Sequence, residues 1–200
     1  MIKAIIFDMG GVLLRTLDEK PRENMAKRFG ISRKRLEQFV FSSQTSLQSE
    51  LGKLSDFAHW QVVLDHFNQQ NISPEEAYYE FFSGDAVDQE LLDFARSLKP
   101  DLKVTLLSNA WKDARRRLGV LFDFIDVFDM AVFSAEVGMR KPDEGIFIHM
   151  INQLEISPEE AIFIDDLLVN VEGASGAGLT GFLFESNFQV IQQVNRLIRG

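Results

Sequence analysis

The chain has 200 residues, 46% of them hydrophobic and 26% charged, which is typical of a folded globular protein and argues against a disordered one. Its formal net charge of −9 argues against nucleic acid or an anionic membrane surface as the main partner. It contains no cysteine, which excludes a disulfide framework, a thiol nucleophile and a zinc–thiolate site.

The first predicted element is a buried strand over Lys3–Phe7, which ends at Asp8. Gly10 and Gly11 follow, and such glycines allow a tight turn or the close approach of a ligand to the backbone. Ligands in open α/β sheets bind outside the carboxyl ends of the strands. Asp8 is therefore the first candidate for a reactive group, and the alternative is that it only caps the following turn.

A long interval rich in helix signals separates this strand from the next one. Ser32 and Ser55 are candidate N-caps, and Ser73–Glu76 is a capping box with Pro74 at the first helical position. A crossover helix over Val87–Lys99 is then expected to lead back to the sheet. The predicted domains are an α-helical cap subdomain over residues 15–83 and an α/β core over residues 1–14 and 84–200.

The rest of the chain alternates between strand and helix patterns. Four apolar runs predict further strands: Lys103–Leu107, Met130–Phe133, Ala161–Ile164 and Thr180–Leu183. A last helix is expected over about Phe188–Ile198. This alternation predicts a Rossmann-like parallel sheet flanked by helices, which is an α/β fold.

Three more polar clusters follow predicted strands. Ser108 can offer a hydroxyl group to an anion, and Lys141 is restricted to an extended backbone by Pro142. Asp165 and Asp166 repel each other unless a cation lies between them, and their oxygen atoms suit Mg²⁺. Taken singly, these groups could be a helix cap, a solvated loop lysine and a capping pair. Together they predict one site, because a parallel sheet brings all strand ends to one edge.

The motifs resemble those of the haloacid dehalogenase-like (HAD) hydrolase superfamily in order and in spacing. They are Phe7–Leu13, Leu107–Asn109, Gly138–Asp143 and Phe163–Ala174. The insertion point is similar to that of members with a helical cap after the first motif, and Glu50–Ser55 resembles a segment common in those caps. The resemblance covers nearly the whole chain, and it implies a hydrolase.

The resemblance also implies the reactive group and the metal ligands. Asp8 would be the catalytic nucleophile and would form an aspartyl-phosphate. Mg²⁺ would be the cofactor, held by the Asp8 carboxylate, the Gly10 carbonyl and Asp166, with Asp165 bound directly or through water.

The same resemblance implies the substrate-binding residues. The phosphoryl group would be held by Gly11, by Ser108, by the backbone N–H group of Asn109 and by the ammonium group of Lys141. Lys141 would also be catalytic, because it would pair with the Asp8 carboxylate and offset charge on the phosphoryl oxygens.

The sequence departs from the family pattern at Gly10. Phosphatases of this family usually carry a second aspartate there, which protonates the leaving group and later activates water. A positioned acid or base is typically worth about 10²–10⁴-fold in rate. A water molecule, a cap residue near Arg15–Asp18, or a leaving group that needs no proton could compensate.

These features predict a Mg²⁺-dependent phosphatase that acts on a small phosphorylated metabolite. One alternative is a 2-haloacid dehalogenase, whose halide leaves without a proton, although Asp165 and Asp166 would then lack a cation. Another is a non-catalytic HAD-like domain that binds a phosphorylated ligand or a protein. We expect a cytoplasmic protein with no nucleic-acid or membrane partner, because no leader or membrane-length apolar run is recognisable. The oligomeric state is left open.

Other conspicuous side chains are predicted to have packing roles. His59, His66 and His149 lack the spacing of metal ligands. The aromatic residues expected to form the core of the cap, with one or two of them facing the substrate, are Phe39, Phe41, Phe57, Trp60 and Phe67. The run Arg115–Arg117 is expected to be a solvated helix face.

Overall fold

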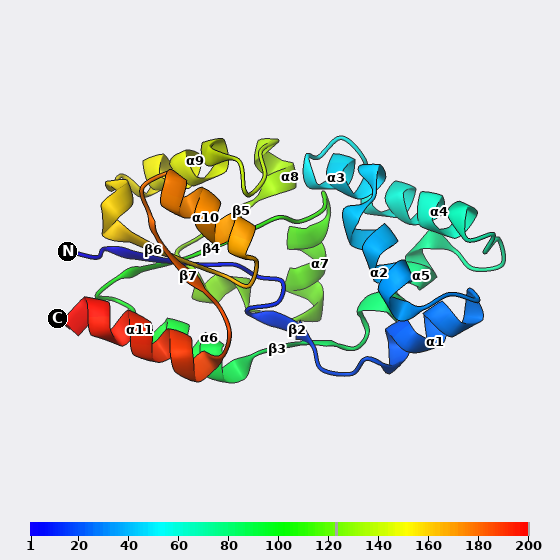
Figure 1. Ribbon diagram of the computed structural model, residues 1–200, viewed down its shortest axis with the longest axis horizontal. Coiled ribbons are helices and arrows are strands. Elements are labelled where there is room, and N and C mark those ends of the chain that lie inside the picture. The colour runs from blue at the N-terminus through cyan, green and yellow to red at the C-terminus, as the bar shows by residue number, and fades with distance from the viewer. Residues whose placement is uncertain (123, 200) are drawn as a thin grey trace.

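A computed structural model describes residues 1–122 and 124–199 and contains a five-stranded sheet and a separate group of helices (Figure 1). The sheet has the order β5-β4-β1-β6-β7, and all neighbouring strands are parallel. Its strands are β1 (Ala4–Phe7), β4 (Lys103–Ser108), β5 (Met130–Phe133), β6 (Ala161–Asp165) and β7 (Thr180–Leu183). The predicted α/β fold is therefore confirmed, and each predicted strand differs by at most one residue at either end.

Helices cover both faces of the sheet, so its central strands are buried. In β1, Ile5 and Phe7 contribute to one apolar cluster, whereas Ala4 and Ile6 contribute to the other. The helices on the first face are α6 (Gln89–Ser97), α7 (Ala114–Leu121) and α11 (Asn187–Arg199). Those on the second face are α9 (Glu144–Leu154) and α10 (Leu168–Gly176). The connections include the short helix α8 (Ser134–Val137) and the 3-10 turns η1 (Ile125–Val127) and η2 (Pro158–Glu160).

Five helices between β1 and β4 form the second unit, which we call the cap. They are α1 (Lys20–Arg28), α2 (Arg33–Ser42), α3 (Gln44–Glu50), α4 (Asp56–His66) and α5 (Pro74–Phe82). The side chains of Ser32, Ser55 and Ser73 accept the predicted capping hydrogen bonds from backbone N–H groups. Trp60 is fully buried at the centre of the cap, whose apolar cluster is separate from those on the sheet.

A two-stranded antiparallel ribbon joins the cap to the core. It pairs β2 (Leu14–Thr16) with β3 (Asp85–Val87). The prediction of a helix over Val87–Lys99 is therefore wrong at both ends, because α6 spans only Gln89–Ser97. Val87 pairs with Leu14, and the Asp88 side chain accepts a hydrogen bond of 2.9 Å from Leu91 N, which starts α6 after Asp88.

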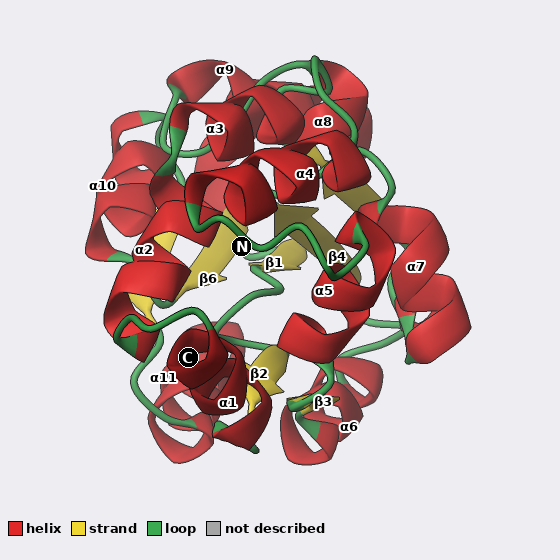
Figure 2. Ribbon diagram, turned by 90° about the vertical axis from the view of Figure 1, so that its right-hand side faces the viewer, coloured by secondary structure: helices red, strands yellow, loops and turns green. Residues whose placement is uncertain are grey.

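The cap packs over the carboxyl edge of the sheet, and Figure 2 shows its helices in front of the strands. Trp111 Nε1 donates a hydrogen bond of 3.2 Å to Ser46 Oγ in α3. Arg140, next to Lys141, donates a hydrogen bond of 2.7 Å to Glu50 at the end of α3. The cap thus contacts two of the loops that follow strands of the sheet.

The expectation of a solvated Arg115–Arg117 run is wrong for Arg117, which is only 2% exposed. It lies with Ala114 and Leu118 on the inner face of α7, and its guanidinium group pairs with Asp56 of the cap at 3.2 Å. Among the described residues, no helix combines the length and the apolar character needed to cross a bilayer.

Candidate active site

Three charged side chains meet where β1 and β6 end. Lys141 Nζ lies 2.5 Å from Asp8 Oδ1 and 2.7 Å from Asp165 Oδ2. Lys141 comes from the loop after α8, and its backbone N–H donates to Asn109, which follows β4. At most 6% of each of the three charged residues is exposed. Chain segments that are distant in the sequence therefore converge on one buried lysine.

Burial and the charges of neighbouring side chains determine the pKa values of Asp8 and Lys141. Burial raises the pKa of Asp8 to about 7, against the opposing effect of the Lys141 ammonium group. Burial alone would lower the pKa of Lys141, but the carboxylates of Asp8 and Asp165 outweigh it and hold that pKa above its ordinary value. Lys141 is therefore a fixed positive charge beside Asp8.

The two adjacent aspartates after β6 have different surroundings. Asn170 Nδ2 donates to both oxygens of Asp165 at 3.0 Å, and Leu167 N donates to one of them at 2.9 Å. Asp165 is therefore held by the protein itself. Burial and the charge of Asp165 raise the pKa of Asp166.

Asp8, Asp165 and Asp166 form a cluster that could take a cation. One oxygen atom from each lies within 4.8 Å of the others. Hard carboxylate oxygens of this kind suit Mg²⁺. Because Asp165 is already occupied by Lys141 and Asn170, the donor set fits a cation placed between Asp8 and Asp166.

Gly11 is packed directly against Asp166. It has a φ of +80°, and a Cβ atom at this position would lie 2.3 Å from Asp166 Oδ2. At Gly10, by contrast, a Cβ atom would have no atom within 4 Å among the described residues. The turn therefore depends on Gly11 for the position of Asp166, and Gly10 leaves open space.

Substituting Gly11 with alanine is expected to weaken Mg²⁺ binding at least about tenfold, because the added methyl group displaces a carboxylate that we assign to the metal site. Gly30→Ala in the cap is the matched control, since Gly30 also has a positive φ of +68° and its added methyl group would meet no described atom within 4 Å, and it should bind Mg²⁺ like the parent protein. Isothermal titration calorimetry measures both affinities. Equal affinities for the two variants would contradict the assignment of Asp166 as a metal ligand.

The side chains of Asn109, predicted to bind substrate only through its backbone, and of Asn170 position the site. The Asn109 side chain donates to Lys141 O at 2.9 Å and accepts from Lys141 N at 2.8 Å, so it fixes the backbone of the lysine. Asn170 fixes Asp165 as described above. The sequence motifs contain both residues, but spacing alone does not show which polar atom an asparagine contacts.

Close packing also fixes the loop that carries Lys141. A Cβ atom at Gly173 in α10 would lie 2.5 Å from Pro142 O, so only glycine fits there. Ser108 is buried at the end of β4 and is 1% exposed. The structure thus places Ser108, Asn109 and Lys141 along one edge of the sheet, as predicted from the motifs.

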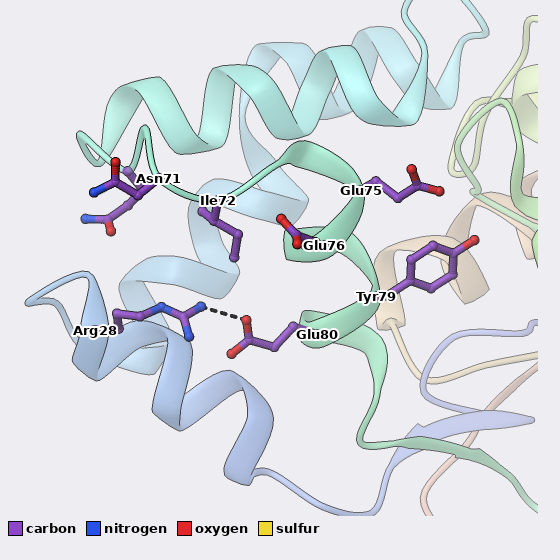
Figure 3. A pocket seen from close by; sticks show the side chains of 8 residues that line it. Arg28, Asn71, Ile72, Glu75, Glu76, Tyr79 and Glu80 are labelled. Atoms are coloured by element: carbon purple, nitrogen blue, oxygen red, sulfur yellow. Dashed lines mark hydrogen bonds and ion pairs between the residues drawn. The ribbon is translucent and has the colours of Figure 1, made fainter.

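A wide, open hollow in the cap lies away from this edge (Figure 3). The Arg28–Glu80 ion pair of 2.6 Å crosses it, and Asn71, Glu75 and Tyr79 also line it. None of the predicted site residues contributes to its described lining. The hollow is therefore a surface feature of the cap and not the candidate active site.

The sequence matches a family model described as "Hydrolase: haloacid dehalogenase-like hydrolase" over residues 2–178. The chain belongs to the haloacid dehalogenase-like hydrolase family. The predicted superfamily and the assignment as a hydrolase are thereby confirmed.

Curated relatives of this HAD-family chain include phosphatases. It is 26% identical to sesquiterpene phosphatase astK from Aspergillus oryzae, over 98% of this chain and 96% of the relative. It is 28% identical to D-ribitol-5-phosphate phosphatase from Bacteroides thetaiotaomicron, over 99% of both chains. In contrast, the chain spans only 37% of drimenol cyclase drtB from Aspergillus calidoustus, to which it is 27% identical.

A solved structure shares the fold. A HAD family enzyme from Bacteroides thetaiotaomicron, in complex with magnesium and inorganic phosphate, matches with a TM-score of 0.78 and 24% identity. The match covers 94% of this chain and 96% of that one.

Proposed function

We propose that this protein is a Mg²⁺-dependent phosphatase that hydrolyses a small phosphorylated metabolite through an aspartyl-phosphate. The observation that carries the proposal is the contact of 2.5 Å between Lys141 Nζ and Asp8 Oδ1, at an edge where Asp166 lies close by. The phosphatases among the relatives support this chemistry. The magnesium and phosphate in the similar Bacteroides enzyme support the choice of metal.

In the proposed reaction, an oxygen of Asp8 attacks phosphorus while the bond between phosphorus and the leaving oxygen breaks. Lys141 favours the ionised form of Asp8 and offsets negative charge on the phosphoryl oxygens, which Ser108 and the Asn109 N–H group also bind. Water then hydrolyses the aspartyl-phosphate, which releases phosphate and restores the carboxylate. Mg²⁺ held by Asp8, the Gly10 carbonyl and Asp166 would supply further positive charge at the phosphoryl group.

Gly10 supplies no acid for the leaving group in this reaction. A Cβ atom at this position would meet no described atom within 4 Å, and Gly10 is exposed, so water can reach this space. Because no side chain there delivers a proton, we expect leaving groups that are stable as anions to depart fastest.

The three clustered carboxylates argue against the dehalogenase alternative. Lys141 supplies one positive charge to Asp8, Asp165 and Asp166. A metal-free reaction would leave this group with excess negative charge, and a divalent cation removes that excess.

Phosphate release from acetyl phosphate, p-nitrophenyl phosphate and ribitol 5-phosphate tests the proposal. We expect release with Mg²⁺ and a fall to the uncatalysed rate with EDTA, with the acyl phosphate reacting fastest because it needs no proton. Failure to hydrolyse any of the three would favour a non-catalytic domain. Halide release from 2-chloropropionate that EDTA does not affect would favour a dehalogenase.

A further inference from the structure

A cavity of about 110 Å³ lies between the cap and the core, beside the candidate site. Met9, which directly follows Asp8, forms part of its wall. So does Ala110, two residues after Ser108. The cavity therefore adjoins the two strand ends that carry the proposed nucleophile and a phosphate-binding hydroxyl group. A phosphate ester at this edge would direct its leaving group into the space.

Aromatic side chains dominate the cavity wall. Tyr78 and Phe82 come from α5, and their ring centroids are 4.8 Å apart. Phe82 also contacts Trp111 at 5.9 Å, and Phe41 lies 6.3 Å from the same indole. Rings packed against one another in this way form a rigid apolar wall, which favours a flat apolar group.

Two of the three charged side chains in the wall accept hydrogen bonds from the protein, whereas the guanidinium group of Arg117 makes none to the described part of the chain. Asp56 accepts a hydrogen bond from the backbone N–H group of Asp113, which directly precedes α7, and Asp85 accepts hydrogen bonds from two other side chains. The Arg117 guanidinium group forms an ion pair with Asp56 at 3.2 Å and lies 4.2 Å from the ring centroid of Tyr78, but its three nitrogen atoms have no hydrogen-bond partner among the described residues. Apart from that guanidinium group, a polyhydroxylated sugar would find few partners here for the hydrogen bonds that it loses to water, and that loss is unfavourable.

The size of the cavity limits the apolar group to about one ring. A cavity of about 150 Å³ with an apolar lining holds benzene in another protein. The space here is smaller, at about 110 Å³, so a single aromatic ring is the largest apolar group that it would enclose.

The absence of an acidic side chain at Gly10 also favours an aromatic leaving group. A phenol has a pKa of about 10, as in tyrosine, so it leaves as a far more stable anion than an alkoxide. An aryl leaving group therefore compensates for the proton that Gly10 cannot deliver.

We propose that the substrate is an aryl phosphate monoester whose single ring occupies this cavity. The reaction step rests on the proposed function: the bond from Asp8 Oδ to phosphorus forms, the bond from phosphorus to the aryl oxygen breaks, and the phenolate leaves with the electron pair. It then takes a proton from water. Binding of the ring does not depend on the reaction.

Binding is tested with non-hydrolysable probes. We expect phenylphosphonate to bind at least about tenfold more tightly than methylphosphonate in the presence of Mg²⁺, measured by calorimetry. Equal affinities would overturn the proposal even if the protein proved to be a phosphatase. Conversely, tighter phenylphosphonate binding without any turnover would leave the cavity assignment standing and contradict the proposed function.

Turnover rates distinguish the effect of the aromatic ring from the effect of a leaving group that needs a proton. We expect kcat/KM for phenyl phosphate to exceed that for benzyl phosphate, which has the same ring but an alkoxide leaving group, by at least about 100-fold. It should also exceed kcat/KM for glucose 6-phosphate. A preference for glucose 6-phosphate would overturn the proposal.

Filling the cavity should remove the preference. Ala114→Leu, on the inner face of α7, is expected to lower the affinity ratio of phenylphosphonate to methylphosphonate to near one. Leu121→Trp is a second variant at a half-exposed position of the wall, where the larger side chain can be accommodated without unfolding. Val120→Leu, at a 79% exposed position of the same helix, is the control and should keep the parent ratio. An unchanged ratio in both cavity variants would contradict the proposal.

Discussion

Replacing Asp8 with asparagine is expected to lower kcat for phosphate release by about 10⁴-fold or more, because the amide oxygen is a poor nucleophile. Asparagine has nearly the same shape as aspartate and can still accept a hydrogen bond from Lys141 Nζ. The variant should therefore fold and keep a melting temperature close to that of the parent. Circular dichroism and steady-state phosphate release measure the two effects.

Trapping of a covalent phosphate label tests directly whether Asp8 is the nucleophile. Rapid acid quenching with radiolabelled acetyl phosphate should trap phosphate on the parent protein and not on Asp8→Asn. Asp101→Asn, at an exposed position that precedes β4 at the opposite edge of the sheet, is the matched control and should keep full activity. Asp8→Asn activity above about 1% of the parent, or a label on that variant, would remove Asp8 from the nucleophile's role.

Replacing Lys141 with methionine is expected to destabilise the protein by about 3–5 kcal/mol, because it leaves Asp8 and Asp165 buried without their common counter-charge. Methionine fills similar space, so the loss reports charge and not a cavity. Urea denaturation measures the free energy of unfolding. Activity should fall as well, because Asp8 then loses the positive charge that lowers its pKa and favours its ionised form.

Two further variants separate charge from packing at Lys141. Lys103→Met, at an exposed position of β4, should change the free energy of unfolding by no more than about 0.5 kcal/mol. Adding Asp165→Asn to Lys141→Met should recover part of the lost stability, since one unpaired carboxylate is removed. A double variant no more stable than Lys141→Met would contradict the charge argument.

The sheet and its reactive edge could be predicted from the sequence because both depend on strong local signals. Buried parallel strands are continuous apolar runs, and Asp8 and Asp165 each stand where such a run stops. A parallel sheet then brings the ends together without any further information. This is why residues as distant in the chain as Asp8 and Lys141 could be placed in one site from their motifs.

The features that the sequence did not predict depend on pairing across the fold. Strands β2 and β3 have three residues each, too few to show a periodic pattern. Arg117 looked like part of a solvated run because its partner Asp56 lies in another domain. The side-chain contacts of Asn109 and Asn170 likewise need the folded backbone to be seen.

The ribbon of β2 and β3 determines how the cap is attached to the core. Thr16 and Asp85 are directly paired, so the polypeptide departs from the core and returns to it at neighbouring points. The length and composition of the segment between them are then independent of the registers within the parallel sheet. That segment can therefore differ in length and sequence, and with it the surface that faces the carboxyl edge of the sheet, without a change in the core residues that we propose for the reaction. The α/β core and the cap can in this sense vary independently of each other.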